Sequence, residues 1–77
     1  MILISKDYHT AVEIRMVKLV ETRAGFSIWA FSGDEQTGAE MARYDNEDAA
    51  EEAYLEILED WQRGCACHDM QHAETWR

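Results

Sequence analysis

The sequence predicts an α+β fold, in which a four-stranded antiparallel sheet is followed by one C-terminal amphipathic helix that packs on one face of the sheet. Three observations predict it. Short apolar segments separated by polar loops fill the first 44 residues, apolar residues then recur with a helical period, and the chain contains no proline. We expect residues 1–64 to form this ββββα domain and residues 65–77 to form a tail.

The first two predicted strands precede the glycine at position 25. Residues 2–5 are an apolar run that ends at a polar stretch, which is typical of a strand followed by a turn. In residues 12–20, Val12, Ile14 and Met16 alternate with charged residues, as in a half-buried strand, but the alternation fails after Met16. We therefore expect either a bulge or a strand end that is covered on both faces.

The third and fourth predicted strands follow a hairpin loop that contains Gly25. Residues 26–31 are rich in aromatic and branched side chains, which favour strands. Residues 39–44 come after a polar loop bracketed by glycines and form the fourth strand, although alanine and glutamate favour strands only weakly.

The helix is predicted between Asp45 and Gly64. Asp45 is a favourable N-cap with Asp48 three residues later, and Gly64 lies where a glycine commonly ends a helix. At 100° per residue the apolar side chains form one stripe, made by Ala50, Ala53, Tyr54, Ile57, Leu58 and Trp61. Acidic residues occupy the opposite side, so the stripe is the side expected to face the sheet.

The charge restricts the class of partner. Among the 77 residues, 16 acids outnumber 7 lysines and arginines, for a formal net charge of -9. Direct nucleic-acid binding needs a basic surface and is disfavoured, whereas a protein with a basic surface is an electrostatically suitable partner. We expect no membrane span and no signal peptide, and the closely spaced Cys65 and Cys67 suggest reduced thiols in a bacterial cytoplasm.

Two short stretches resemble a known group of proteins. Leu3-Ile4-Ser5-Lys6-Asp7 looks like an Ile-Ile-Ser-Gln-Asp opening, with lysine in place of the usual glutamine. Residues 42–53 resemble the segment in which a strand leads into a helix. Both features are similar to those of short uncharacterised ββββα proteins of Gram-positive bacteria and their phages. The resemblance implies a mobile-element accessory protein and transfers no catalytic residues.

The acidic side of the helix is the first candidate site. Eight acidic residues and no basic residue lie between positions 45 and 60. Negative charge near the helix C-terminus opposes the helix dipole, and we expect neighbouring carboxylates to repel one another, so a basic partner would relieve both costs. The predicted partner-binding residues are Asp48, Glu52, Leu55, Glu56 and Glu59, with Leu55 as an apolar anchor. The competing interpretation is a solvated helix face.

The sheet supplies the second candidate. Pairing Glu21 with Phe26 places Met16 opposite Phe31 and Lys18 opposite Trp29, so both sheet faces carry large apolar groups. Because one helix covers one face, we expect Met16, Lys18, Trp29 and Phe31 to form a homodimer interface. A surface for another protein, or coverage by the tail with Trp76, are the alternatives.

The C-terminal tail contains four residues of zinc-ligand type, Cys65, Cys67, His68 and His72. Their chemistry suits zinc, but the Cys-x-Cys spacing is shorter than usual and all four come from one terminal stretch. We therefore predict no metal and no cofactor.

Catalysis finds little support in the sequence. His9 and Asp7 flank Tyr8, but no nucleophile motif or phosphate-binding loop accompanies them. A surface pair is the expected interpretation, and we predict that the chain is not an enzyme.

The predicted function is therefore inhibition of a bacterial defence system by a phage or mobile-element protein, in the manner of an anti-CRISPR, with the acidic helix on a basic, nucleic-acid-handling surface. The alternatives are a homo-oligomeric protein that binds or sequesters a nucleotide signal, and a bacterial adaptor protein. For the nucleotide alternative, the candidate cations are Arg15, Lys18, Arg23 and Arg43.

Overall fold

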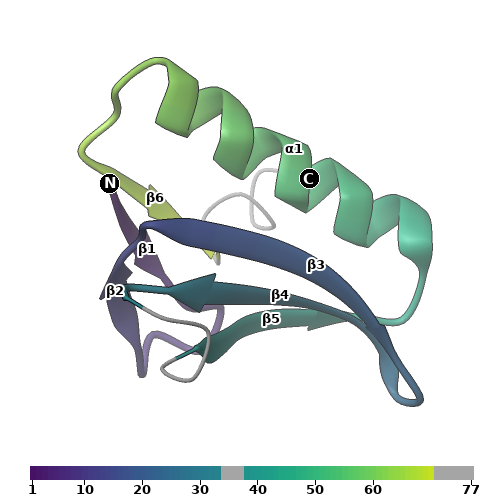
Figure 1. Ribbon diagram of the computed structural model, residues 1–77. Helices are drawn as coiled ribbons and strands as arrows, with labels where there is room; N and C mark the ends of the chain where they lie inside the picture. The colour runs from purple at the N-terminus through teal and green to yellow at the C-terminus, as the bar shows by residue number, and fades with distance from the viewer. Residues whose placement is uncertain (34–37, 71–77) are drawn as a thin grey trace.

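The computed structural model describes residues 1–33 and 38–70 and places one helix against strands from two sheets (Figure 1). In chain order, the elements are β1 (Ile2–Ile4), β2 (Ala11–Glu13), β3 (Met16–Thr22), β4 (Gly25–Phe31), β5 (Ala39–Tyr44), α1 (Glu47–Gln62) and β6 (Cys67–Asp69). The α+β class agrees with the sequence. The single four-stranded sheet is wrong, because the described strands form two three-stranded sheets.

The first sheet has the order β2-β1-β6 and the second β3-β4-β5. β1 is antiparallel to β2 and parallel to β6, whereas the second sheet is antiparallel throughout. β6 begins three residues after Gly64, within the segment predicted as a tail. Its pairing with β1 is non-local in sequence, and a three-residue strand leaves little periodicity for sequence analysis to detect.

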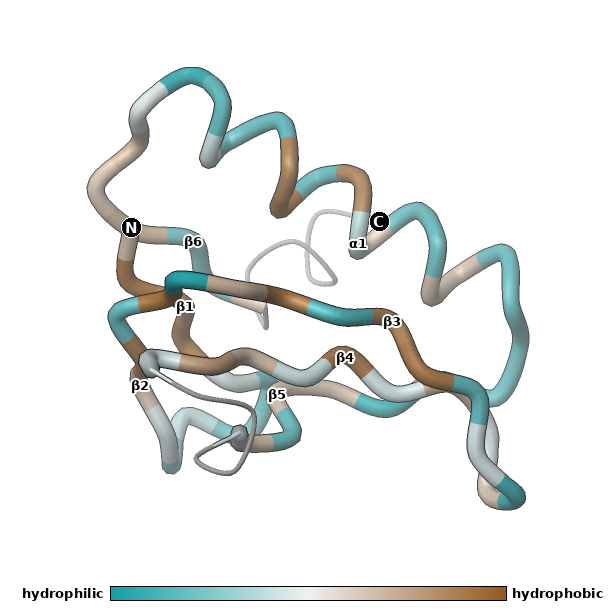
Figure 2. Tube along the Cα trace, in the orientation of Figure 1, coloured by the Kyte–Doolittle hydropathy of each residue, from teal (hydrophilic) through white to brown (hydrophobic). Residues whose placement is uncertain are grey.

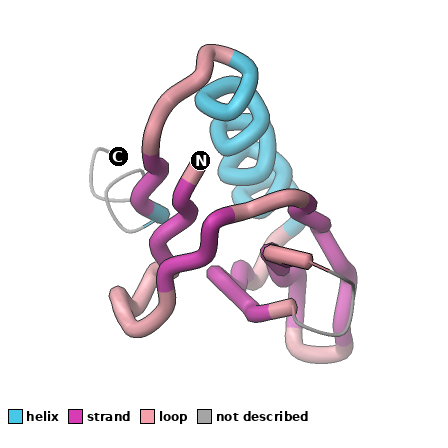
Figure 3. The backbone as a smooth tube through the Cα atoms, turned by 60° about the vertical axis from the view of Figure 1, so that its left-hand side comes forward, coloured by secondary structure: helices cyan, strands magenta, loops and turns pink. Residues whose placement is uncertain are grey.

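The two sheets separate at Ile14 and Arg15, within the segment predicted as one strand. The N–H of Ile14 donates to the carbonyl of Met1 at 3.0 Å, whereas the N–H of Arg15 donates to the carbonyl of Phe31 at 2.8 Å. Consecutive amides therefore belong to different sheets, which diverge from this point (Figure 3). Arg15 and Met16 both lie opposite Phe31, which is the arrangement of a β-bulge. This bulge lies before the position after Met16 at which the alternation of the sequence fails.

The register of the central hairpin is confirmed. Met16 pairs with Phe31, Lys18 with Trp29 and Glu21 with Phe26. The strand β5 has the predicted bounds, and Met41 is an extra residue between the Ile28–Ala42 and Trp29–Glu40 pairs. This bulge buries the Met41 side chain, which is 2 % exposed.

The helix begins one residue later than predicted, since the N-cap is Asn46 and not Asp45. Asn46 has an extended backbone, and its side chain accepts a hydrogen bond from the N–H of Ala49 at 2.8 Å. At the other end, Gly64 has φ +81°, a conformation that glycine adopts without a steric penalty. Gly64 N–H donates to Trp61 and Cys65 N–H to Asp60, which completes a Schellman motif and confirms the predicted C′ glycine.

The apolar stripe of α1 faces the second sheet, as predicted. Ala50, Ala53 and Ile57 are buried, and Tyr54, Leu58 and Trp61 pack at the edge of the same core. Figure 2 shows the hydrophobic parts of the α1 trace on the side toward the sheet and the hydrophilic parts on the outer side. The core they reach includes fully buried Ile28 and Ala30 of β4. One helix therefore covers one face of this sheet.

The other face of the second sheet is partly covered as well. Phe31 is buried at 7 % exposure, while Trp29 and Met16 are half-buried. Gly38 lies directly against the Phe31 ring, because a Cβ built on Gly38 would come within 2.2 Å of a ring carbon. The ammonium of Lys18 lies 5.7 Å from the ring centroid. The close approach of the chain at Gly38 therefore removes Phe31 from the surface.

A further buried contact ties β6 to the helix. His68 is 7 % exposed, and its Nδ1 lies 2.5 Å from a carboxylate oxygen of Asp60 in the last turn of α1. The same strand continues the first sheet through the Leu3–His68 pair. Asp60 carries negative charge near the helix C-terminus, which the helix dipole disfavours, and buried His68 is its structural partner.

We expect Gly38→Ala to lower the free energy of unfolding by about 1–3 kcal/mol, because the new methyl group must displace the Phe31 ring. Urea denaturation measures the change. In a Phe31→Leu background, which shortens the side chain, the same substitution should cost less. Equal costs in the two backgrounds would contradict the proposed Gly38–Phe31 contact.

We expect Asp60→Ala to lower the free energy of unfolding by about 1–3 kcal/mol, since buried Nδ1 of His68 then lacks a partner. The double substitution Asp60→Ala with His68→Phe removes both polar groups and should cost less than the sum of the two single substitutions. Thermal or urea unfolding of the four proteins tests this, and strict additivity would show that the pair is not coupled.

Candidate binding surfaces

The predicted helix residues share the solvent side of α1. Asp48, Glu52 and Glu59 are exposed, Glu56 is partly exposed, and Leu55 is 57 % exposed. Positions separated by three and four residues lie on one side of a helix, which explains why these side chains gather opposite the buried stripe. The structure therefore brings the whole predicted set together as one acidic face, defined by Asp48, Glu52, Leu55, Glu56 and Glu59.

The charges on the acidic face are unevenly balanced along the helix. Glu47 and Asp48 lie in the first turn, where the helix dipole favours negative charge. Near the other end, the guanidinium of Arg63 lies 3.7 Å from Glu59 and 3.9 Å from Asp60. Both ion pairs are long, and the exposed Arg63–Glu59 pair is of small energetic value. The face keeps a strongly negative character with an apolar side chain at its centre.

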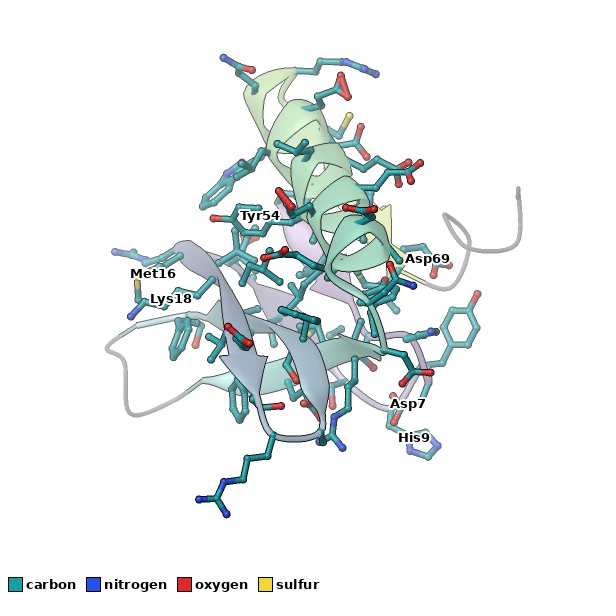
Figure 4. All side chains as sticks on the ribbon, turned by 90° about the vertical axis from the view of Figure 1, so that its right-hand side faces the viewer. Asp7, His9, Met16, Lys18, Tyr54 and Asp69 are labelled. Carbon is teal, nitrogen blue, oxygen red and sulfur yellow. The ribbon has the colours of Figure 1, made fainter. Side chains whose placement is uncertain are left out.

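The predicted dimer residues are neighbours, but they do not form one open apolar surface. Met16 lies beside Phe31 and Lys18 beside Trp29 on the outer face of the second sheet. Figure 4 shows Met16 and Lys18 on the side of the molecule away from Asp7, His9 and Asp69. Phe31 is buried within the chain itself, so its prediction as an interface residue is wrong. Met16, Lys18 and Trp29 keep partial exposure.

A groove that the sequence did not indicate runs along β5. It has a volume of about 480 Å³ and is lined by Lys6, Asp7, Glu40, Met41, Ala42 and Arg43. Arg43 donates to both carboxylate oxygens of Glu40 at 3.1 Å, and the ammonium of Lys6 lies 4.8 Å from the centroid of the Tyr44 ring. Two cations and two carboxylates line the groove. Of the four basic residues predicted for nucleotide binding, Arg43 lines this groove.

A hydrogen-bonded loop, residues 5–10, borders this groove. The hydroxyl of Ser5 donates to Asp7 at 2.6 Å, and the N–H of His9 donates to the same carboxylate oxygen at 3.0 Å. Tyr8 has φ +64°, which is unfavourable for a residue with a side chain. Its hydroxyl donates to Asp69 of β6 at 3.0 Å, and its ring is 58 % exposed. The loop thus presents an aromatic ring in one defined orientation.

Two pKa values in this loop depart from their ordinary values. The Ser5 hydroxyl, and next the His9 N–H, lower the pKa of Asp7 below its ordinary value, because both stabilise the carboxylate. Partial desolvation, and then the contact with Asp69, raise the pKa of Tyr8. His9 and Asp7 are an exposed pair 3.7 Å apart.

The zinc-type residues are separated by the structure. His68 is buried and directed to Asp60, whereas Cys67 is exposed and Cys65 is partly buried. His72 lies outside the described residues. Within residues 1–33 and 38–70, no three His, Cys, Asp or Glu side chains are grouped so that they could hold a metal ion.

We expect wild type to lose stability relative to Asp7→Asn in acid. Because the folded pKa of Asp7 lies below the unfolded value, its stabilisation is complete above the unfolded pKa of about 3.9 and is lost as the pH falls through the folded pKa. Urea unfolding at a series of pH values compares the two proteins. A difference in stability that is constant with pH would contradict the hydrogen-bonded carboxylate.

The described part of the chain has no helix that is long and apolar enough to cross a bilayer. Comparisons with known proteins gave no match: no protein-family model, no curated protein and no solved structure is significantly similar to the chain.

Proposed function

We propose that the chain is a non-catalytic binding protein whose acidic face occupies a basic, nucleic-acid-handling surface of a partner protein. The observation that supports this is the exposed row of carboxylates on one side of α1 with Leu55 at its centre. A protein that handles nucleic acid carries a cationic surface, and a net charge of -9 steers the chain toward it.

The geometry of the helix suits this role. Residues four apart on a helix are about 6 Å apart along its axis, so Asp48, Glu52 and Glu56 present a regular line of negative charge. The buried stripe on the opposite side holds α1 on the sheet, so the line does not depend on the partner for its order. Leu55 adds apolar area that water-exposed charges alone do not supply, and it lies at the centre of the face, where binding energy at interfaces concentrates.

The more specific proposal is that the partner belongs to a bacterial defence system and that the chain is a phage or mobile-element inhibitor that acts in the cytoplasm of the host. It draws on the resemblance of residues 3–7 and 42–53 to short proteins of Gram-positive bacteria and their phages. An inhibitor of this kind works by occupancy, in which carboxylates replace the nucleic-acid phosphates on the cationic surface. No bond is made or broken, so a binding face is sufficient for the function.

We expect Glu52→Gln, Glu56→Gln and Glu59→Gln, introduced together, to abolish capture of the partner while the fold is kept, because all three side chains lie on the solvent side of α1. Capture from a bacterial lysate by the immobilised chain, followed by mass spectrometry, identifies proteins retained by wild type. Retention should fall as salt rises, since added ions screen exposed charges.

The matched control neutralises the same number of carboxylates elsewhere, with Glu13→Gln, Glu21→Gln and Asp45→Asn, all exposed and off the acidic face. This control should retain the partner. If both variants lose the partner equally, net charge alone is responsible. If the first variant captures the same proteins as wild type, the acidic face is not the binding site.

A second function, binding of a nucleotide signal, is favoured by the groove that contains Lys6 and Arg43. The neighbouring exposed Tyr8 ring could stack on a base. Asp7 and Glu40 line the same groove and repel phosphates, which places this function second. Thermal-shift measurements with nucleotides distinguish the two functions, because a nucleotide binder would be stabilised by ligand and the proposed inhibitor would not.

A further inference from the structure

The outer edge of β3 is a surface that none of the proposed functions uses. β3 is the end strand of the second sheet, and β4 is its strand partner on the inner side. Among the residues that the structure describes, no strand pairs with its other side. The strand is seven residues long and carries apolar side chains at four positions, Met16, Val17, Leu19 and Val20. Trp29, half-buried on the neighbouring strand β4, completes the patch. Long open edges of this kind readily pair with another strand.

The hairpin determines which backbone groups point outward. Thr22 and Gly25 flank the two-residue loop and form the last pair of the ladder, so they are the hydrogen-bonded pair next to the turn. In an antiparallel ladder such pairs recur at every second residue, so even-numbered residues of β3 bond to β4. Leu19 and Glu21 therefore direct their N–H and C=O groups to the open edge. Consistently, the carbonyl of Val17 accepts a hydrogen bond from the Tyr54 hydroxyl of α1 at 3.3 Å.

We propose that this edge pairs with the β3 edge of a second copy of the chain, antiparallel and around a twofold axis at Val20. Outward groups occur at odd positions in both copies, so odd residues must pair with odd residues. With the axis at Val20, Leu19 of each copy forms a hydrogen-bonded pair with Glu21 of the other, and the two Val20 side chains face each other. The β3-β4-β5 sheets of the two copies then form one continuous sheet.

Two observations select Val20 as the centre. Val20 is a large apolar side chain with 37 % exposure, and pairing covers it. A register centred on Leu19 would lay the second strand along Val17, where the Tyr54 hydroxyl already occupies the carbonyl. Shifting the axis to Val20 moves the second copy toward the hairpin loop and away from the helix, which packs mainly on β4 and β5.

The charge near β3 also favours a second copy. The chain as a whole is strongly negative, but Lys18 and Arg23 outnumber Glu21 along β3 and its loop. In the proposed register Lys18 lies opposite Thr22 of the second copy, so no like charges face each other directly. This edge is therefore a place where two acidic molecules can meet without apposing their carboxylates. The proposal concerns the strand edge and is independent of the acidic face.

Cross-linking at the axis tests the proposal. In an antiparallel sheet, residues that face each other without hydrogen bonds have Cα atoms about 4.5 Å apart, within the range for a disulfide. In a Cys65→Ser, Cys67→Ser background, Val20→Cys should form a covalent dimer under mild oxidation. Lys18→Cys, on the same face of the same strand, lies opposite Thr22 and should remain uncross-linked. Light scattering of the wild type should give double the monomer mass at high protein concentration.

A second variant separates pairing from folding. Val20→Lys places like charges together at the axis and should return the protein to monomer mass with unchanged circular dichroism. The proposal is overturned if wild type stays monomeric at every concentration, if Lys18→Cys cross-links as fast as Val20→Cys, or if Val20→Cys is captured by the strand of a different protein instead of by its own copy.

Discussion

The rest of the structure depends on the divergence of two adjacent amides, those of Ile14 and Arg15. One donates to Met1 and the other to Phe31, so the chain leaves the first sheet and enters the second within one residue. A chain of 77 residues can bury only a small hydrophobic core. The crossing lets the two short sheets share that core. Ile14 itself is buried at 4 % exposure, which holds the crossing point in that core.

The crossing also decides what the helix covers. Because β1 and β2 turn away, the second sheet consists of three strands, and α1 packs on one face of it. The return of the chain after Gly64 then places β6 beside β1 and brings His68 under the last turn of the helix. The helix is thus held by its apolar stripe and by a buried polar contact at its C-terminal end. A helix held in this way can carry a high density of negative charge on its outer side.

The surface is consequently divided into regions of different chemistry. The outer side of α1 is acidic. The β5 groove carries balanced charges beside the loop that presents Tyr8. The β3 edge is apolar with a slight excess of positive charge. The acidic side and the β3 edge lie on different elements, so a second copy and a basic partner could be bound without competing for the same residues. A dimer would present two acidic faces on one side of a joined sheet.

The sequence by itself determined the elements whose signals are local. The helix, its buried stripe, its C-terminal glycine and the Met16–Phe31 register follow from periodicity and turn chemistry in adjacent residues. The members of the acidic face could be identified for the same reason, because helical spacing alone places them together. The N-cap was misplaced by one residue, since Asp45 and Asn46 are both good caps and backbone geometry chooses between them.

Tertiary structure decided the features that join distant residues. The parallel pairing of β6 with β1, the groove between Lys6 and β5, and the contact of Gly38 with Phe31 each unite segments that no local pattern relates. Burial of Phe31 likewise depends on the close approach of Gly38, so an aromatic side chain that was predicted on an open face lies inside. Sequence periodicity reports which side of an element is apolar, whereas the chain's path in space determines what covers that side.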